Sequence, residues 1–503
     1  MALILSGSLN ISGSVTAETI VLTSTASFAG TASWAINVVN GGGSAFPYTG
    51  SAQITGSLGI TGSLDVGGYL NNTSGLRSFT QGFFVIAQGI NSHAQGGSTK
   101  ATGDSSHAEG SLTLAQGIAS HAEGDTTFAS GDYSHAEGQY TTASGISSHA
   151  EGTYAIASGN GSHAEGGYTV ASNTVSHAEG QYTLASNIAA HAEGNQTTAS
   201  GQFSHAEGSK TLASNTGTHA EGSGSRSTGI ASHAEGFYTL SSGTYSHAEG
   251  RFTTSSGQFA HAEGSASVAF GIGAHAEGIG VTATGNYSHA EGYGIPGLAG
   301  FAYAYASHIE GAGTTAQFSA EFSHAEGNGS QTLGPYSHAE GGGTSAHATA
   351  SHAEGLVAQS RGDYSHAEGY DTRAWAPYSH AEGERTNTHG TGSHAQGYYT
   401  VTSASYQNVQ GTYNLPVLED YAFVIGNGFD EENRSNLVNA YGSNFEISGS
   451  LKVTGSATIY DMLVIVSQSV LPATAPSGAI MTSGSGADFK PYFWNGDTWT
   501  SLI

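Results

Sequence analysis

A tetrapeptide of the form His-Ala-Glu-Gly returns every fourteen residues through most of this chain, and this period restricts the fold more than any other feature. The motif histidines lie at His93 and every 14 residues to His289, then at His308, and from His324 every 14 residues to His394. Weaker units, "FTQG" at 79–82 and "NVQG" at 408–411, keep the spacing at either end. Together they make 24 units between about residues 78 and 411. A fixed period of this kind indicates a solenoid of stacked repeats.

Each unit consists of two halves of the form [ST]-x-A-x-G-x-x. A heptad helix is excluded because Gly in every turn costs about 1 kcal/mol each and no apolar a/d stripe exists. As a strand, "SHAEG" places Ser, Ala and Gly on one face and His and Glu on the other. In the second half, as in "TLASN", Thr and Ala point inward. We expect a positive φ at the Gly or Asn that recurs at positions 131, 145, 159, 173, 187, 201 and 215.

The sequence therefore predicts an all-β fold: a parallel, two-sided β-roll solenoid of about 24 coils of 14 residues. Small β-rich stalk and cap modules flank it. Its interior of Ala, Ser and Thr buries little apolar area per coil, which at roughly 25 cal/mol per Å² is a small gain against the ordering entropy. We therefore expect several copies to pack along a common axis.

The chain divides into four expected segments. These are a β-rich stalk or attachment segment at 1–77, the β-roll at 78–411 with a break at 293–323, a cap at 412–446, and a β-rich tip at 447–503. Short strands between glycines are indicated by "SGSLNISGS" (6–14), "TGSLGITGS" (55–63) and "SGSLKVTGS" (448–456). Residues 25–35 fit a strand or a helix, so the conformation of 15–50 stays open. Asn495-Gly496 between aromatic runs predicts a hairpin.

The 14-residue unit resembles the head repeat of YadA-like trimeric autotransporter adhesins, which has the form N-S-V-A-I-G followed by a half rich in small residues. Here "S-H-A-E-G" stands in the place of "S-V-A-I-G", over about residues 78–411. The resemblance implies a left-handed parallel β-roll and a trimer in which the Val and Ile positions face the other chains. His and Glu replace both apolar residues here, so the chemistry of that interface differs. Arrays of HAEG units are also similar to those of tail fibres of tailed phages and related particles.

Several explanations are open for the His and Glu columns: acid–base catalysis, metal binding between coils or chains, pairing at a subunit interface, or an exposed charged face. Twenty-two motif His accompany twenty motif Glu. Near-identical pairs along a rod form no single cleft, so we expect no catalytic residue, no cofactor site and no metal site. We expect a ladder of paired side chains at the trimer axis, represented by His107, Glu109, His121, Glu123, His135, Glu137, His177, Glu179, His191, Glu193, His205 and Glu207.

The titration of this ladder has two expected forms. Pairing would raise the His pKa and lower the Glu pKa, so that stability is highest between the two values. Desolvation would instead lower the His pKa and leave a neutral imidazole beside Glu. Protonation of all 24 His would change the formal net charge from −27 to −3.

Composition excludes several partners. A net charge of −27 with 11 Lys plus Arg argues against nucleic acid or an anionic membrane surface as a partner. The chain has no Cys for disulfides and no run of 18 apolar residues that would insert into a membrane. The first residues lack the charged and apolar regions of a secretory signal, so we expect synthesis in a host cytoplasm.

These features predict a non-enzymatic, homotrimeric tail fibre of a phage or phage-like particle, located in the virion. One end would bind virion or tail proteins, and the fibre would attach to a host-surface glycan or protein. The alternatives are an architectural whisker without receptor binding and a bacterial surface adhesin. A polysaccharide depolymerase is disfavoured because a 14-residue coil leaves no room for an acidic cleft.

Aromatic side chains are the candidate receptor contacts, because exposed rings stack on sugars. The break "YGIPGLAGFAYAYAS" at 293–307 predicts a looped-out coil that carries Phe301, Tyr303 and Tyr305. Trp494 and Trp499 lie near the end of the chain. The alternative for all five residues is local packing.

Overall fold

The structure, a computed structural model, describes residues 64–66, 72–294, 300–449, 451–452, 454, 480–483, 490–495 and 497–501. These residues contain no helix and form a parallel β-solenoid of about 25 coils of about 14 residues, which confirms the predicted fold class. The expected strands at 6–14 and 55–63 and the open segment 15–50 lie outside the described residues. Two compact units, Met1–Val175 and Ser176–Ile503, are described separately below.

In the first compact unit, Met1–Val175, each 14-residue coil contributes a five-residue strand to one sheet and a two-residue strand to a second sheet. The five-residue strands have odd numbers, begin at the motif His position, and run from β3 (Phe79–Phe83) to β15 (His163–Gly167). The two-residue strands have even numbers and run from β2 (Asn72–Thr73) to β16 (Val170–Ala171). β1 (Leu64–Val66) also pairs in parallel with β3. The first sheet therefore begins before residue 78, because backbone pairing does not require the motif.

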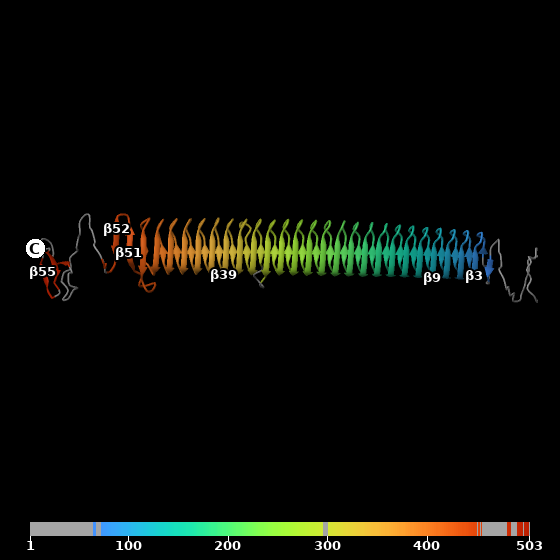
Figure 1. Cartoon of the computed structure of the whole chain (residues 1–503), viewed down its shortest axis with the longest axis horizontal. Coiled ribbons are helices and arrows are strands. Elements are labelled where there is room, and N and C mark those ends of the chain that lie inside the picture. Colours follow the sequence, from blue (N-terminus) through green and yellow to red (C-terminus); the bar gives the residue numbers. More distant parts are fainter. Residues whose placement is uncertain are drawn as a thin grey trace, which may run out of the picture. The chain divides into compact units, whose positions relative to one another are not determined.

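The second unit continues the same pattern. Its five-residue strands run from β17 (His177–Gln181) to β49 (Asn408–Thr412), and its two-residue strands from β18 (Leu184–Ala185) to β48 (Val401–Thr402). Within each unit, the first-sheet strands lie side by side as aligned arrows in Figure 1. Strand pairing is in register, with each motif His beside the His of the next coil, as for His191 and His205.

After β49, the first sheet extends into the expected cap segment. β50 (Phe423–Asn427) pairs in parallel with β49, and β51 (Asn436–Tyr441) and β52 (Asn444–Ile447) follow as antiparallel strands. A separate antiparallel sheet consists of β53 (Ile480–Ser483), β54 (Lys490–Trp494) and β55 (Trp499–Ser501). The antiparallel pairing of β54 with β55 confirms the predicted hairpin.

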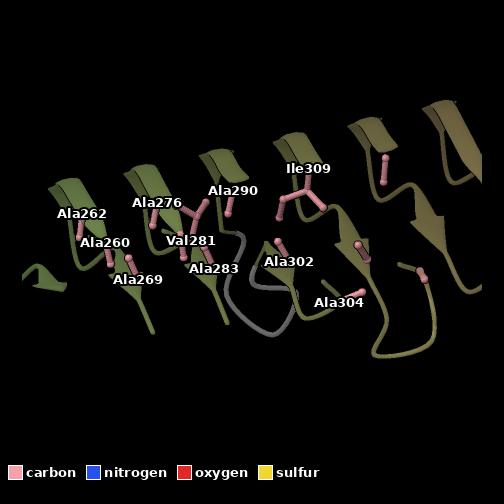
Figure 2. Close-up of a cluster of buried hydrophobic side chains, with 14 residues drawn as sticks. Ala260, Ala262, Ala269, Ala276, Val281, Ala283, Ala290, Ala302, Ala304 and Ile309 are labelled. Carbon is pink, nitrogen blue, oxygen red and sulfur yellow. The ribbon is translucent and has the colours of Figure 1, made fainter. Parts of the chain in front are cut away.

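The interior between the two sheets is thin and consists of small side chains, as predicted. Ala192, Thr197 and Ala199 are fully buried, whereas His191 and Glu193 in the same coil are half-buried on the outer face. Figure 2 shows the alanine side chains directed into the space between the layers, with larger groups only at Val281 and Ile309. Strand parity alone therefore predicts which residues fill the core.

The turns differ from the sequence-based expectation. Positive φ does not occur at Gly131 and Gly145 but two residues later, at Tyr133 (59°) and Ser147 (54°). The motif glycine also has positive φ, as at Gly138 (107°), in a region that side chains disfavour. Gly131 serves a different need, because a Cβ there would collide with the carbonyl oxygen of Gly145 in the next coil. Close stacking on the next turn, not the φ angle, therefore requires glycine at Gly131.

The break in the repeat is narrower than expected. Residues 295–299 lie outside the described residues, and Phe301–Ala302 already forms β34, which pairs with β32 (Thr282–Ala283) and β36 (Thr315–Ala316). Phe301, Tyr303 and Tyr305 thus belong to a regular coil and not to a looped-out one. The strands on either side of residues 295–299 pair in register, as β33 (His289–Tyr293) does with β35 (His308–Ala312).

The interior compensates for this break. Gly300 occupies the inward position that Thr takes in most coils, so a side chain is missing there. The space is taken by Val281 and Ile309, whose methyl carbons would lie 3.2 and 3.3 Å from a Cβ at Gly300. Ile309 replaces the Ala of the motif, and this explains the variant tetrapeptide "HIEG".

The second sheet ends at β48, and side-chain amides occupy the place of the next strand. The Asn414 amide accepts a hydrogen bond from the Val401 backbone N–H (2.7 Å) and donates one to its carbonyl (2.9 Å). Asn436 makes the same pair of bonds with Leu415. These amides satisfy backbone groups that would otherwise form an open sheet edge.

We expect Ile309→Ala to destabilise the second unit by about 2–5 kcal/mol, because it leaves a cavity beside Gly300. Gly300→Thr alone should also destabilise, since its side chain would contact Ile309 closely. The double variant restores the regular Ala and Thr of the repeat, so it should recover much of the loss. Denaturant unfolding of the three variants measures this coupling, and additive losses in the double variant would contradict the packing explanation.

Candidate functional site

The outer face of the first sheet carries the predicted His and Glu columns. All twelve residues of the predicted ladder lie there, and each His lies near the Glu two residues later in its own strand. The Nε2–Oε2 distances are 3.6 Å for His107–Glu109 and 3.7 Å for His191–Glu193. They are 3.7, 4.0, 3.8 and 3.7 Å for the pairs that begin at His121, His135, His177 and His205. The structure thus brings the predicted partners together on one chain.

In-register pairing stacks the imidazole rings into columns within each unit. Ring centroids of His107 and His121 are 4.7 Å apart with an interplanar angle of 2°. In the second unit His191 and His205 are 4.6 Å apart at 3°. The Nε2 atoms of these four residues are enclosed and accept or donate no hydrogen bond within the described part of the chain. The Glu side chains are more open, at 45% exposed for Glu193.

Burial is the main cause of the lowered pKa of three histidines of the column, His233, His289 and His366. Loss of solvent around the ring, followed by the charges of the neighbouring His219 and His247, lowers the pKa of His233 to about 4. The same order of causes lowers the pKa of His289 and of His366 to about 4. Pairing with Glu does not dominate, so the expected rise of the His pKa is wrong for the single chain at these positions. Desolvation, the alternative considered above, prevails because stacked imidazoles shield one another from water and repel when charged.

In the first and last His units, Gln replaces the Glu of the motif, so the column of Glu side chains ends in a neutral amide. Gln396, which replaces Glu in the last His unit, donates a hydrogen bond to Glu382 Oε1 at 3.1 Å. His394 lies 3.6 Å from Glu382 of the preceding coil. The terminal amide therefore supplies a donor to a carboxylate that another Glu would repel.

The His and Glu columns contain imidazole and carboxylate groups, which are ligands for transition metals. His121, Glu123 and His135 offer ligand atoms that lie within 4.8 Å of one another. The two rings, however, are stacked 4.7 Å apart at 3°, so their nitrogen lone pairs run parallel and do not converge on one point. These groups would have to rotate out of the column to coordinate one ion.

The candidate receptor contacts lie in two places. Phe301 and Tyr303 stack at 4.9 Å, and Tyr303 stacks on the exposed Phe318 at 4.5 Å. Tyr305 lies between Tyr287 and Phe322 in a line of turn aromatics. These contacts favour local packing for the three residues, although Tyr305 remains 43% exposed.

The terminal tryptophans pack on each other in the hairpin. Trp494 is buried at 5% exposed, and its ring centroid lies 5.3 Å from that of the half-buried Trp499. Trp494 is therefore a packing residue of this small sheet rather than an exposed platform.

Two features of the structure were not predicted from the sequence. Aromatic residues occupy left-handed turn positions in successive coils, as in the stack of Tyr140, Tyr154 and Tyr168 with φ of 56°, 57° and 58°. Arginines also cluster near the last coils, at Arg373 and Arg385. The available signals were the 14-residue spacing of the turn Tyr residues and the 12-residue spacing of Arg361, Arg373 and Arg385.

A comparison with protein-family models and with curated proteins found no match to this chain. Among the described residues, no helix has the length and apolar character needed to cross a membrane. The fold and the His–Glu face are therefore the basis for the functional argument.

We expect the protein to lose stability as the pH falls from the ordinary His pKa of 6.5 toward about 4. A group whose pKa is lower in the folded state binds more protons when unfolded, so acidification favours unfolding within this window. Circular-dichroism melts between pH 8 and pH 4 measure the effect. A triple variant with Gln at His233, His289 and His366 should show a shallower dependence, and a melting temperature that rises on acidification would contradict the assignment.

Proposed function

We propose that this chain is the non-enzymatic subunit of a homotrimeric fibre of a phage or phage-like particle, and that the fibre attaches the particle to a host surface. The observation that carries the proposal is the half-buried His–Glu face, which repeats without change of register along each unit. Side chains at 35% and 44% exposure, as in His107 and Glu109, leave area for another protein surface. The same two motif positions hold the Val and Ile that face the trimer in YadA-like head repeats.

The thin interior supports assembly. Most core residues are Ala, Ser and Thr, so each coil buries little apolar surface of its own. The His–Glu face is composed of five-residue strands and is the broader of the two sheet faces. Packing this face against other copies adds buried area in every coil. Across such an interface, Glu carboxylates of one copy accept hydrogen bonds from donors of another, because the Glu side chains are the more open members of the pairs, at 44% exposure for Glu109.

The proposal is tested first by the mass and activity of the pure protein. Light scattering at micromolar concentration should give three times the chain mass, and electron micrographs should show a thin rod. The protein should bind host cells without shortening their surface polysaccharide. A monomer or dimer mass contradicts the trimer, polysaccharide cleavage contradicts the non-enzymatic role, and a trimer that binds no cell supports an architectural fibre instead.

A set of substitutions tests which face lies at the trimer interface. His→Ala at His191, His205, His219, His233 and His247 should weaken the trimer, since breaking a buried polar pair costs about 3–5 kcal/mol. Replacing His by Val and the paired Glu by Ile in the same coils should be tolerated, because apolar residues of similar size often substitute for buried pairs. Dissociation of the trimer in denaturant, followed by light scattering, compares the two sets. Equal behaviour of both sets would place the His–Glu face on the outside.

A further inference from the structure

The second sheet carries an ordered group of basic and polar side chains over three consecutive coils near the end of the roll. β42 (Gln359–Ser360), β44 (Arg373–Ala374) and β46 (Asn387–Thr388) pair in register, with Arg373 between Gln359 and Asn387. In the adjacent turn, Asp371, Arg385 and Tyr399 repeat at the same 14-residue spacing. The chain has only 11 Lys plus Arg, so this concentration of arginine is exceptional for it.

The arginines are held in defined positions. Arg373 donates to Asp371 Oδ1 at 2.7 Å, and Arg385 Nε lies 3.7 Å from Asp371 Oδ2. The Arg385 guanidinium also lies 5.1 Å from the centre of the Tyr399 ring. A guanidinium has five N–H donors, so the hydrogen bond from Arg373 and the ion pair from Arg385 orient these groups on Asp371 without using all of their donors. At 37% and 40% exposure, both side chains remain accessible to a ligand.

A third arginine reaches the same place from beyond the roll. Arg434 donates to the backbone carbonyls of Tyr399 (2.9 Å) and Asn414 (3.3 Å). It therefore lies beside Tyr399, which is 35 residues earlier in the sequence. The result is an open groove lined by Asp371, Arg373, Arg385, Asn387, Tyr399 and Arg434. Glu431 also lines it. Three arginines thus face two carboxylates here, a local excess of positive charge on a chain of formal net charge −27.

We propose that this groove binds an acidic oligosaccharide. Planar guanidinium groups recognise a carboxylate or phosphate group of the ligand through paired hydrogen bonds. Asp371 and Glu431 are acceptors, and the Asn387 amide both donates and accepts, which suits the hydroxyl groups of a sugar but not a bare anion. The large negative charge elsewhere on the chain disfavours a long polyanion such as nucleic acid. This inference rests on the proposed function, because the groove is accessible in the trimer only if the second sheet faces outward from the fibre.

The binding experiment uses the full chain and immobilised oligosaccharides. The probes are oligogalacturonate, oligosialic acid and a sugar-phosphate oligomer, with carboxyl-reduced oligogalacturonate as the neutral control. The protein should bind at least one acidic probe and not the neutral one. Arg373→Gln with Arg385→Gln should weaken that binding at least tenfold. The matched control is Arg251→Gln, because Arg251 also packs on an aromatic ring, at 4.7 Å from Phe252, but lies outside the groove; it should bind as the unaltered chain does.

The outcomes separate this inference from the proposed fibre. Unaltered melting curves of the variants show that the roll remains folded, so that a loss of binding reports on the groove. Binding of none of the acidic probes, equal binding of the reduced probe, or full binding by the double variant would overturn the site. Light scattering on the same samples reports the trimer independently. A trimer without acidic-sugar binding refutes only the groove, and a monomer that binds through Arg373 and Arg385 refutes only the assembly.

Discussion

Every feature of the roll depends on the in-register stacking of one coil on the next. Backbone N–H groups of each coil donate to carbonyls of the next coil, as in the 2.8 Å bonds from His107 to Ser120 and from His121 to Ser134. Stacked strands lie about 4.8 Å apart, so each side chain contacts the equivalent side chains above and below. A residue type is therefore acceptable in the core and in the motif columns only if it packs well against copies of itself. Alanine in the core and glycine in the motif meet this condition for steric reasons.

The same condition explains the choice of His on the outer face. A column of permanently charged cations at this spacing would repel along its whole length. Imidazole avoids the repulsion because it can lose its proton, and the lowered pKa of His233, with burial as the main cause and His219 and His247 next, shows that the neutral form is favoured at this position. Planar imidazole rings also stack face to face, as His191 does on His205. The Glu side chains are the more open members of the pairs, at 45% exposure for Glu193, so they gain most from donors supplied by another molecule.

Much of the fold followed from the sequence because strand parity and a strict period fix the environment of most residues. The inward Ala and Thr, the outward His and Glu, and the β54–β55 hairpin are local consequences of alternation and turn chemistry. The turn conformation could not be read locally, since Tyr133 adopts a positive φ only because the stacked turns impose it. The packing of Ile309 against Gly300 and the hydrogen bond from Arg434 to the Tyr399 carbonyl join residues that do not stand at a repeat spacing from each other. No periodic pattern encodes such contacts.

The two sheets also differ in how much chemical variety they permit. Five-residue strands with small inner residues hold the first sheet in register, and its outer columns are uniform. The outward position of the second sheet instead holds Leu184, Thr198 and Arg373 without any change in strand pairing. Because the backbone register does not depend on this position, individual coils can carry different side chains. A group of arginines can therefore arise over a few coils of the second sheet, whereas a comparable change in the His–Glu columns would interrupt the self-packing of every neighbouring coil.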